Sequence, residues 1–117
     1  MITKCTLRSN GDDGIHVEGT GSYIFDNICD GNNTGEFSSG IVITQDSTDN
    51  RIERNLLISN AQGIRTDGSS SGNLIIRNSA SGNTTNYDTQ PGNFVGTVVS
   101  TETAMNAAPN DLVNIEF

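Results

Sequence analysis

The side chains with the most evident chemical potential are carboxylates placed near glycines. Asp12 and Asp13 stand side by side before Gly14, and Asp30 and Glu36 follow further along the chain. Carboxylate oxygens are ligands that calcium prefers, so Asp12, Asp13, Asp30 and Glu36 form a candidate Ca²⁺ site if the fold brings them onto neighbouring turns. The alternative is an acidic edge that faces water. No other cofactor is indicated.

The single histidine, His16, follows this acidic pair closely. A histidine beside a carboxylate can act as a general base, and His16 could in principle serve Asp13 or a nearby serine. The pair Asp13-Gly14 is equally typical of a turn, and alternation places His16 on the surface. The sequence therefore allows two interpretations of these residues, a turn and a reactive cluster.

A third group of residues favours a binding surface. Charged residues recur at one position of a repeat described below, and aromatic and basic residues lie beside them: Lys4, Asp26, Arg54 and Arg77, with Tyr23, Phe25 and Arg51. Such a mixture could cradle a saccharide, although Phe25 could instead pack under an insertion at Thr34–Phe37.

The elements that position these residues form a repeat. The segment Gly40–Asn60 aligns without a gap with Gly63–Asn83, 23 residues later. The pattern extends upstream through Gly14–Asn32 and a partial unit, Ile2–Asn10. A repeat of this length indicates stacked structural units, and the Thr34–Phe37 insertion belongs in a turn between them.

Apolar residues recur in four columns of the aligned repeat, and the positions between them are mostly polar. The columns are Ile2/Ile24/Ile52/Ile75, Leu7/Cys29/Leu57/Ala80, Ile15/Ile41/Ile64 and Val17/Ile43/Thr66. Alternation with period two is typical of strands with one buried face. We therefore predict an all-β chain, a parallel β-helix of about three and a half coils, each of about 23 residues, and the family resemblance given below implies that it is right-handed. An antiparallel sandwich would leave the repeated asparagines unexplained.

Asparagine and glycine mark the expected corners of each coil. Asparagines fall in two columns, Asn10/Asn32/Asn60/Asn83 and Asn27/Asn55/Asn78. Because asparagine tolerates the left-handed conformation and can bond to a stacked copy of itself, we predict ladders at bends. We expect Gly14, Gly40 and Gly63 to supply a further tight corner.

The repeat is no longer recognisable after Asn83. Residues 84–117 carry both prolines and irregularly spaced apolar residues. This pattern favours coils over residues 1–83 and a C-terminal cap over 84–117, which would cover the last coil and its strand edges.

Composition limits the function further. The 117 residues are 32% apolar and carry a net charge of −8, which opposes binding to nucleic acid or anionic lipid. No run is long enough to cross a membrane, and residues 1–5 show no secretion signal. The predicted register separates the Cα atoms of Cys5 and Cys29 by about 8 Å, too far for a disulfide.

The coil pattern resembles bacterial right-handed β-helix proteins, the group that includes pectate lyases, polygalacturonases, alginate epimerases and phage tailspikes. Gly40-Ile41 followed by Asn50-Arg51-Ile52-Glu53-Arg54-Asn55 resembles the generic coil of this group, and Ser81–Gly96 resembles its usual ending. The resemblance implies a structural or saccharide-interacting segment of a secreted or cell-surface bacterial protein, with a polysaccharide or surface glycan as partner. It is specific for fold rather than activity.

A carbohydrate-active enzyme, a uronan or pectin hydrolase or lyase, is the alternative. Gly11-Asp12-Asp13-Gly14 resembles a polygalacturonase segment whose paired carboxylates act as acid and base, and Gly63–Thr66 loosely resembles a substrate-binding segment of that family. The resemblance implies catalytic roles for Asp12, Asp13 and Arg65, with His16 as a further candidate. Ser39-Gly40 replaces the family's His-Gly, and Arg65 lacks a lysine partner.

The first coil carries no cap in the sequence. We expect Ile2, Leu7, Ile15 and Val17 to form an apolar end face beside unpaired strand edges. This end belongs either to the C-terminal portion of a longer protein, which would cover it, or to a homo-oligomer that pairs through it.

Overall fold

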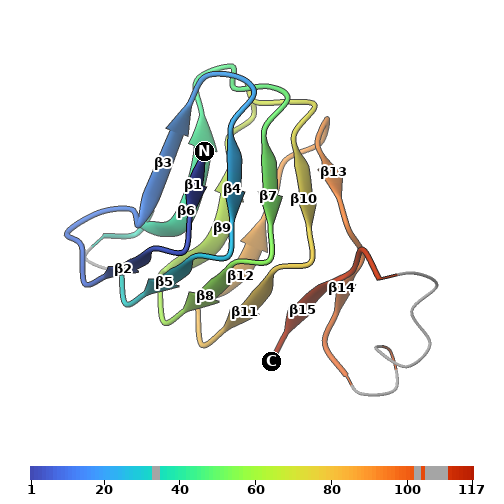
Figure 1. Cartoon of the computed structure of the whole chain (residues 1–117). Coiled ribbons are helices and arrows are strands. Elements are labelled where there is room, and N and C mark those ends of the chain that lie inside the picture. The colour runs from blue at the N-terminus through green and yellow to red at the C-terminus, as the bar shows by residue number, and fades with distance from the viewer. Residues whose placement is uncertain (33–34, 102–103, 105–110) are drawn as a thin grey trace.

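The computed structural model is a three-sided solenoid of parallel strands (Figure 1). It describes residues 1–32, 35–101, 104 and 111–117. Each turn contributes one strand to each of three sheets, and about four turns are stacked. Within the described residues, no helix is long and apolar enough to cross a membrane. The all-β parallel solenoid predicted from the repeat is confirmed.

Sheet A forms the first side of the solenoid. Its strands lie in the order β1 (Ile2–Thr3), β4 (Tyr23–Phe25), β7 (Arg51–Glu53), β10 (Leu74–Ile76) and β13 (Phe94–Val95). Every neighbouring pair is parallel. Residues on either side of each buried isoleucine point away from the core, so this sheet carries two outer rows.

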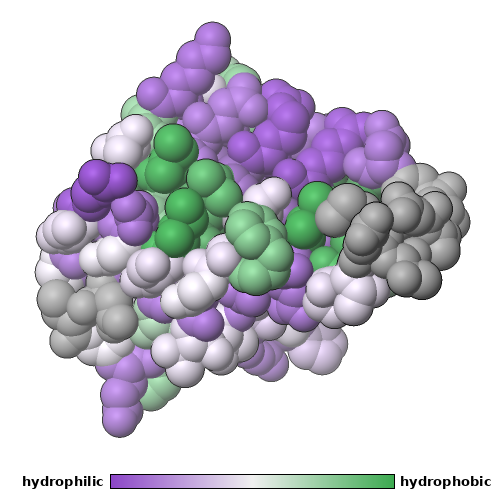
Figure 2. Space-filling view, turned by 90° about the horizontal axis from the view of Figure 1, so that it is seen from below, coloured by the Kyte–Doolittle hydropathy of each residue, from purple (hydrophilic) through white to green (hydrophobic). Residues whose placement is uncertain are grey.

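Sheets B and C form the other two sides. Sheet B contains β2 (Thr6–Arg8), β5 (Ile28–Asp30), β8 (Leu56–Ile58), β11 (Ser79–Ser81), β15 (Asn114–Glu116) and β14 (Val98–Val99), in that spatial order. Sheet C contains β3 (Ile15–Glu18), β6 (Ser39–Thr44), β9 (Gln62–Thr66) and β12 (Thr85–Asp88). Seen from below in Figure 2, an apolar patch interrupts the polar surface. Ile28 pairs with Leu56 in the outer row of sheet B.

The core consists of the predicted columns. Ile24, Ile52 and Ile75 pair in one register and are fully buried. Cys29, Leu57 and Ala80 do the same in sheet B, and the Ile15 and Val17 columns form in sheet C. Stacking like residues lets a core with few apolar side chains remain closely packed. The two cysteines are free, as the register predicted.

The corners depend on a column of residues that the sequence reasoning assigned to a binding surface rather than to a bend. Asn27, Asn55 and Asn78 stack in a ladder, with Nδ2 of Asn55 donating to Oδ1 of Asn78 at 3.0 Å. The left-handed conformation belongs to the residue before each asparagine rather than to the asparagine, with φ of 53° at Arg54 and 58° at Arg77. The asparagine side chain satisfies backbone groups of the neighbouring coils at these bends.

The predicted glycine corner is wrong in its mechanism. Gly14, Gly40 and Gly63 do not have positive φ. A Cβ on Gly40 would lie 2.8 Å from the carbonyl oxygen of Gly63 and 2.9 Å from Cδ1 of Leu57. Close approach of stacked backbones, not a turn, therefore requires glycine in this column.

The sheets continue beyond Asn83. Strand β12 pairs with β9, so Tyr87 extends the Ile64 column, and its hydroxyl donates to the carbonyl oxygens of Asn78 and Ile115. Strand β13 places Val95 on the Ile75 column. The last strand, β15, lies between β11 and β14 and pairs with both.

The N-terminal end is less apolar than expected. Ile2 is exposed and Leu7 is half-buried, but Ile15 and Val17 are buried although they lie on the edge strand of sheet C. The expected end face of four apolar residues is thus wrong for two of them. Ile15 and Val17 belong to the core cluster, against which Leu7 packs.

Candidate functional site

The candidate acid–base residues lie on the outer side of sheet C. Oδ2 of Asp13 is 3.2 Å from Nδ1 of His16, while Oδ1 of Asp13 accepts a hydrogen bond from the backbone nitrogen of Ser39 at 2.7 Å. Nε2 of His16 lies 2.9 Å from Oγ1 of Thr44 and 3.2 Å from a carboxylate oxygen of Glu18. Asp13 therefore both anchors the next coil and contacts the histidine.

The other two residues predicted for catalysis do not join this cluster. Asp12 is exposed in the turn before β3. Arg65 is in the same outer row as His16 but two strands away, because His16 pairs with Val42 and Val42 pairs with Arg65. Two strand spacings separate them by about 10 Å. The Arg65 guanidinium lies instead over the Phe37 ring, 5.5 Å from its centroid.

The residues predicted to bind calcium are also dispersed. Asp30 makes an ion pair with Arg8 at 2.7 Å on the outer side of sheet B. Glu36 is exposed on the loop before β6, and Thr34, the first residue of the expected insertion, lies outside the described residues. In the described part of the chain, no three His, Cys, Asp or Glu side chains are close enough together to hold a metal ion.

The outer side of sheet A brings together the aromatic and basic residues that the sequence suggested as a binding surface. One outer row runs Tyr23, Arg51, Leu74, Phe94, and the other runs Phe25, Glu53, Ile76. Arg54 and Arg77 occupy the corner directly after these strands. We call the polar part of this surface the arginine platform: Tyr23, Phe25, Arg51, Glu53, Arg54 and Arg77.

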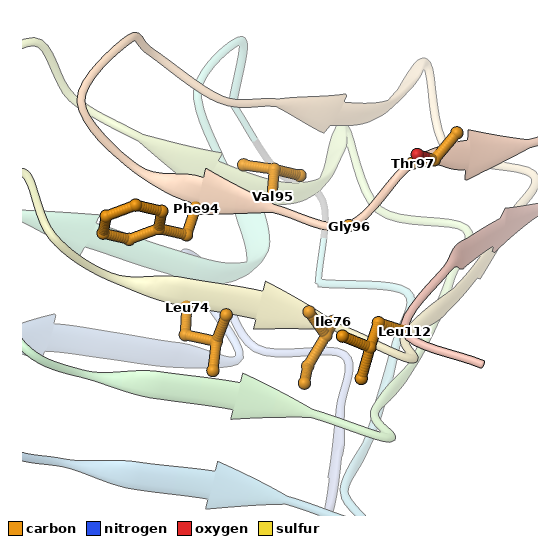
Figure 3. A pocket seen from close by; sticks show the side chains of 7 residues that line it. All are labelled: Leu74, Ile76, Phe94, Val95, Gly96, Thr97 and Leu112. Atoms are coloured by element: carbon orange, nitrogen blue, oxygen red, sulfur yellow. The ribbon is translucent and has the colours of Figure 1, made fainter. Parts of the chain in front are cut away.

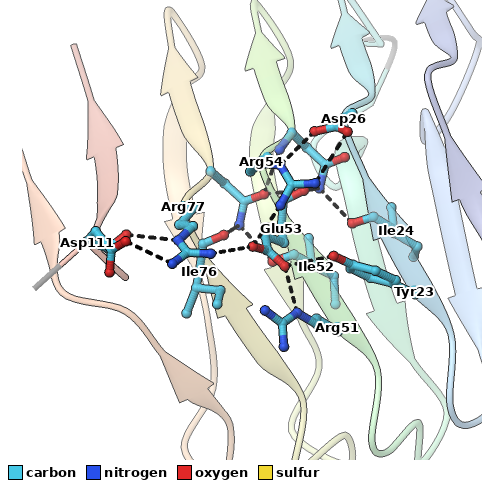
Figure 4. A network of polar contacts seen from close by, with 12 residues as sticks. Tyr23, Ile24, Asp26, Arg51, Ile52, Glu53, Arg54, Ile76, Arg77 and Asp111 are labelled. Carbon is cyan, nitrogen blue, oxygen red and sulfur yellow. Dashed lines mark hydrogen bonds and ion pairs between the residues drawn. The ribbon is translucent and has the colours of Figure 1, made fainter.

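A buried carboxylate organises the arginine platform (Figure 4). Glu53 is only 1% exposed and accepts hydrogen bonds from Nε of Arg51 at 2.6 Å, Nη1 of Arg77 at 2.8 Å and Nη1 of Arg54 at 3.0 Å. The hydroxyl of Tyr23 donates to it at 2.9 Å. Hydrogen bonds from Arg51, Arg77 and Tyr23 outweigh the effect of burial and lower the pKa of Glu53 to about 2.

Charges in the platform are locally balanced. Arg54 also binds Asp26, with Nε 2.8 Å from Oδ1, and Arg77 binds Asp111, with Nη2 3.0 Å from Oδ2. Three guanidinium groups thus face three carboxylates, including Glu53. The arginine side chains remain about a third to a half exposed. The platform therefore offers fixed N–H donors without a large excess of positive charge.

The aromatic pair forms the other part of the platform. The rings of Tyr23 and Phe25 stack with centroids 4.3 Å apart. The guanidinium carbon of Arg51 is 5.6 Å from the Tyr23 centroid, and that of Arg54 is 5.6 Å from the Phe25 centroid. Phe25 thus lies with Tyr23 rather than under the insertion before β6, and the rings and guanidinium groups hold each other in place.

A pocket adjoins the platform on the C-terminal side (Figure 3). It has a volume of about 300 Å³ and is lined by Leu74, Ile76, Phe94, Val95, Gly96, Thr97 and Leu112. Leu74 and Ile76 follow Arg51 and Glu53 in the two outer rows of sheet A. The polar platform and the apolar pocket are therefore consecutive parts of one surface.

Sequence reasoning found most of the platform but not Glu53 or the pocket. Glu53 lies at an outward position flanked by Arg51 and Arg54, and that local charge pattern was the available signal. Its burial arises because Tyr23 and Arg77, from the coils on either side, close over it. The pocket depends on Leu112, which lies far from the strands of sheet A in the sequence and outside the repeat.

The stacked parallel sheets place this protein in the class of β-solenoids, and its sheet A carries the arginine platform and the adjoining pocket. The family model of the right-handed β-helix region matches residues 1–111, and the chain belongs to this family. Comparisons with curated proteins and with solved structures gave no significant match.

Proposed function

We propose that the arginine platform binds a neutral saccharide and that the protein acts at the cell surface or outside the cell. The observation that carries this proposal is the buried Glu53, which fixes three guanidinium groups beside a stacked aromatic pair. Fixed planar donors beside apolar ring edges suit hydroxyl groups and the C–H faces of sugars. Local charge balance and the net charge of −8 disfavour polyanions.

Titration by NMR with neutral oligosaccharides and with oligogalacturonates tests this proposal. Arg51→Ala should weaken binding of the neutral ligand by about tenfold or more, because it removes charge-assisted donors. Arg8→Ala is the matched control, since Arg8 also makes an exposed ion pair but on sheet B. Equal losses in the two variants, or tighter binding of the uronate, would contradict a neutral saccharide site on sheet A.

The second candidate function is a uronan or pectin hydrolase or lyase that uses Asp12 and Asp13. The contact between Asp13 and His16 favours it, because a carboxylate beside a histidine can orient that base. Release of reducing ends or unsaturated products from polygalacturonate would support an enzyme, provided that His16→Ala abolishes it. Turnover that persists in this variant would have to come from other residues.

We also propose that the edge strands β1, β2 and β3 pair with the same edge of a second copy. These strands end their sheets in the described chain, and Ile2 is exposed beside them. Light scattering should show an oligomer that Ile2→Asp weakens. Ile15 is a poor probe because its burial would make a charge there destabilise the coil itself. A monomeric wild-type chain would overturn this interface.

A further inference from the structure

The pocket on sheet A has the size and lining of a small-ligand site. Its volume of about 300 Å³ lies at the lower end of the range for small-molecule pockets. Ile76 forms a buried wall, whereas the Phe94 ring is 67% exposed. Figure 3 shows Phe94, Leu74, Ile76 and Leu112 around one hollow. Aliphatic and aromatic carbons dominate this lining, so the pocket suits an apolar group.

The pocket and the arginine platform are aligned along the solenoid axis. In the outer row Tyr23, Arg51, Leu74 and Phe94, each residue pairs directly with the next on the adjacent strand. One strand spacing of about 4.8 Å therefore separates a charged row position from an apolar one. The distance from Tyr23 to Phe94 spans about 14 Å, which a sugar with one attached substituent can cover.

Hydrogen bonds hold the arginine platform and the pocket together where they adjoin. Arg77 follows Ile76 directly, and its guanidinium binds both Glu53 in the platform and Asp111, the residue before Leu112. Nε of Arg77 also donates to the carbonyl oxygen of Asp111 at 3.0 Å. The same arginine thus ties the C-terminal segment that lines the pocket to the centre of the platform.

We propose that this surface binds a saccharide carrying an apolar substituent, an alkyl, acyl or aryl group, with the sugar on the platform and the substituent in the pocket. This inference rests on the proposed saccharide site and adds the chemistry of its ligand. The polar end supplies donors for hydroxyl groups, and the apolar end buries carbon surface. A ligand that has both a sugar and an apolar substituent gains binding affinity from both parts of the surface, although it carries no charge.

The test compares methyl and n-hexyl glycosides of glucose, galactose and mannose, titrated against the whole chain by NMR. The hexyl glycoside of the sugar that binds should bind about ten- to a hundredfold more tightly than its methyl glycoside, because the pocket removes several methylenes from water. n-Hexanol alone should bind more weakly than the hexyl glycoside.

Phe94→Ser should remove most of the hexyl advantage and leave binding of the methyl glycoside unchanged. Phe37→Ser is the matched control, because Phe37 is 65% exposed against 67% for Phe94 but lies beside sheet C. Both rings are exposed, so neither change threatens the core. Arg51→Ala should weaken both glycosides by the same factor, since it acts on the sugar.

The possible outcomes separate the two proposals. If methyl glycosides bind and hexyl glycosides bind no better, the apolar substituent is refuted while the saccharide site stands. If hexanol binds as tightly as the hexyl glycosides and methyl glycosides do not bind, the saccharide site is refuted and the inference fails with it. An equal loss of the hexyl advantage in Phe94→Ser and Phe37→Ser would refute the placement in this pocket.

Discussion

Replacement of Glu53 by glutamine tests the centre of the platform. The pKa of this carboxyl falls from 4.5 to about 2, with hydrogen bonding to Arg51 as the largest cause. At about 1.4 kcal/mol for each pH unit, the ionised side chain contributes about 3 kcal/mol to folding at neutral pH. Because the three arginines stay partly in water, the loss should not reach the upper end for stranded buried charges, about 5 kcal/mol.

Urea unfolding at pH 7, followed by circular dichroism, measures this loss. Glu53→Gln should lower the free energy of unfolding by about 3 kcal/mol. The control is Glu18→Gln, whose carboxylate is half exposed and contacts His16, and it should cost less than about 1 kcal/mol. A loss below about 1 kcal/mol for Glu53→Gln, or similar losses in both variants, would refute the argument that the buried carboxylate stabilises the coil.

The pH dependence provides a second check with a defined sign. A carboxyl group with a lowered native pKa stabilises the fold above its unfolded pKa and loses that contribution as the pH falls through the native value. The difference between wild type and Glu53→Gln should therefore be constant above about pH 5 and shrink toward zero near pH 2. Asp67, with its pKa also lowered to about 2, titrates in both proteins and cancels in the comparison. A difference independent of pH would contradict ion pairing as its cause.

Three further experiments test the core and the stacking of the coils. Leu57→Ala should cost about 2–5 kcal/mol in urea unfolding because it leaves a cavity between two small neighbours, whereas Leu56→Ala, on the outer side, should cost clearly less. A thiol reagent should label one cysteine in the native protein and two after denaturation without reductant, because Cys5 is exposed while burial raises the pKa of Cys29 to about 12. Gly40→Ala should destabilise the protein by more than about 1 kcal/mol in the same assay, since its Cβ would contact a carbonyl oxygen at 2.8 Å; an unchanged midpoint would show that the stacked backbones can move apart.

The repeat predicted the core because parallel stacking makes sequence columns into spatial columns. Ile52 pairs with Ile75, and Leu57 with Ala80, at the same 23-residue separation that the alignment showed. Period-two alternation then assigns the inner and outer sides of each strand. Both signals can be found in the sequence itself, so neither needed knowledge of the tertiary structure.

Features that depend on contacts between coils were harder to predict. Gly40 is required by the backbone of the next coil, which its own neighbours in sequence do not reveal. The position of β15 between β11 and β14 has no counterpart in the repeat, because consecutive strands of the repeat belong to different sheets, whereas β14 and β15 belong to the same one. Asn114 nevertheless continues the ladder of Asn78, but Asn106 and Asn110 precede it closely in the sequence, so the sequence did not indicate which asparagine would join the ladder.

The candidate sites were likewise predicted from the sequence only in part. Tyr23, Phe25 and Arg51 were placed on the outer side by alternation, and the structure brings them together. Asp13 and His16 also contact each other, but Arg65 lies two strands away from His16. The catalytic role of Arg65 was inferred from the family resemblance, which does not take the register of this chain into account.

The corners couple the stability of the coil to the geometry of the platform. Arg54 and Arg77 adopt the left-handed conformation, and each is followed directly by a ladder asparagine whose side chain is buried. Nδ2 of Asn55 donates to the carbonyl oxygen of Glu53, and Nδ2 of Asn78 donates to that of Ile76. The ladder therefore fixes the backbone on both sides of each corner, and with it the direction in which the guanidinium leaves the chain. A left-handed residue is strained unless its surroundings hold it, so the buried amides supply the rigidity that a preorganised donor surface needs.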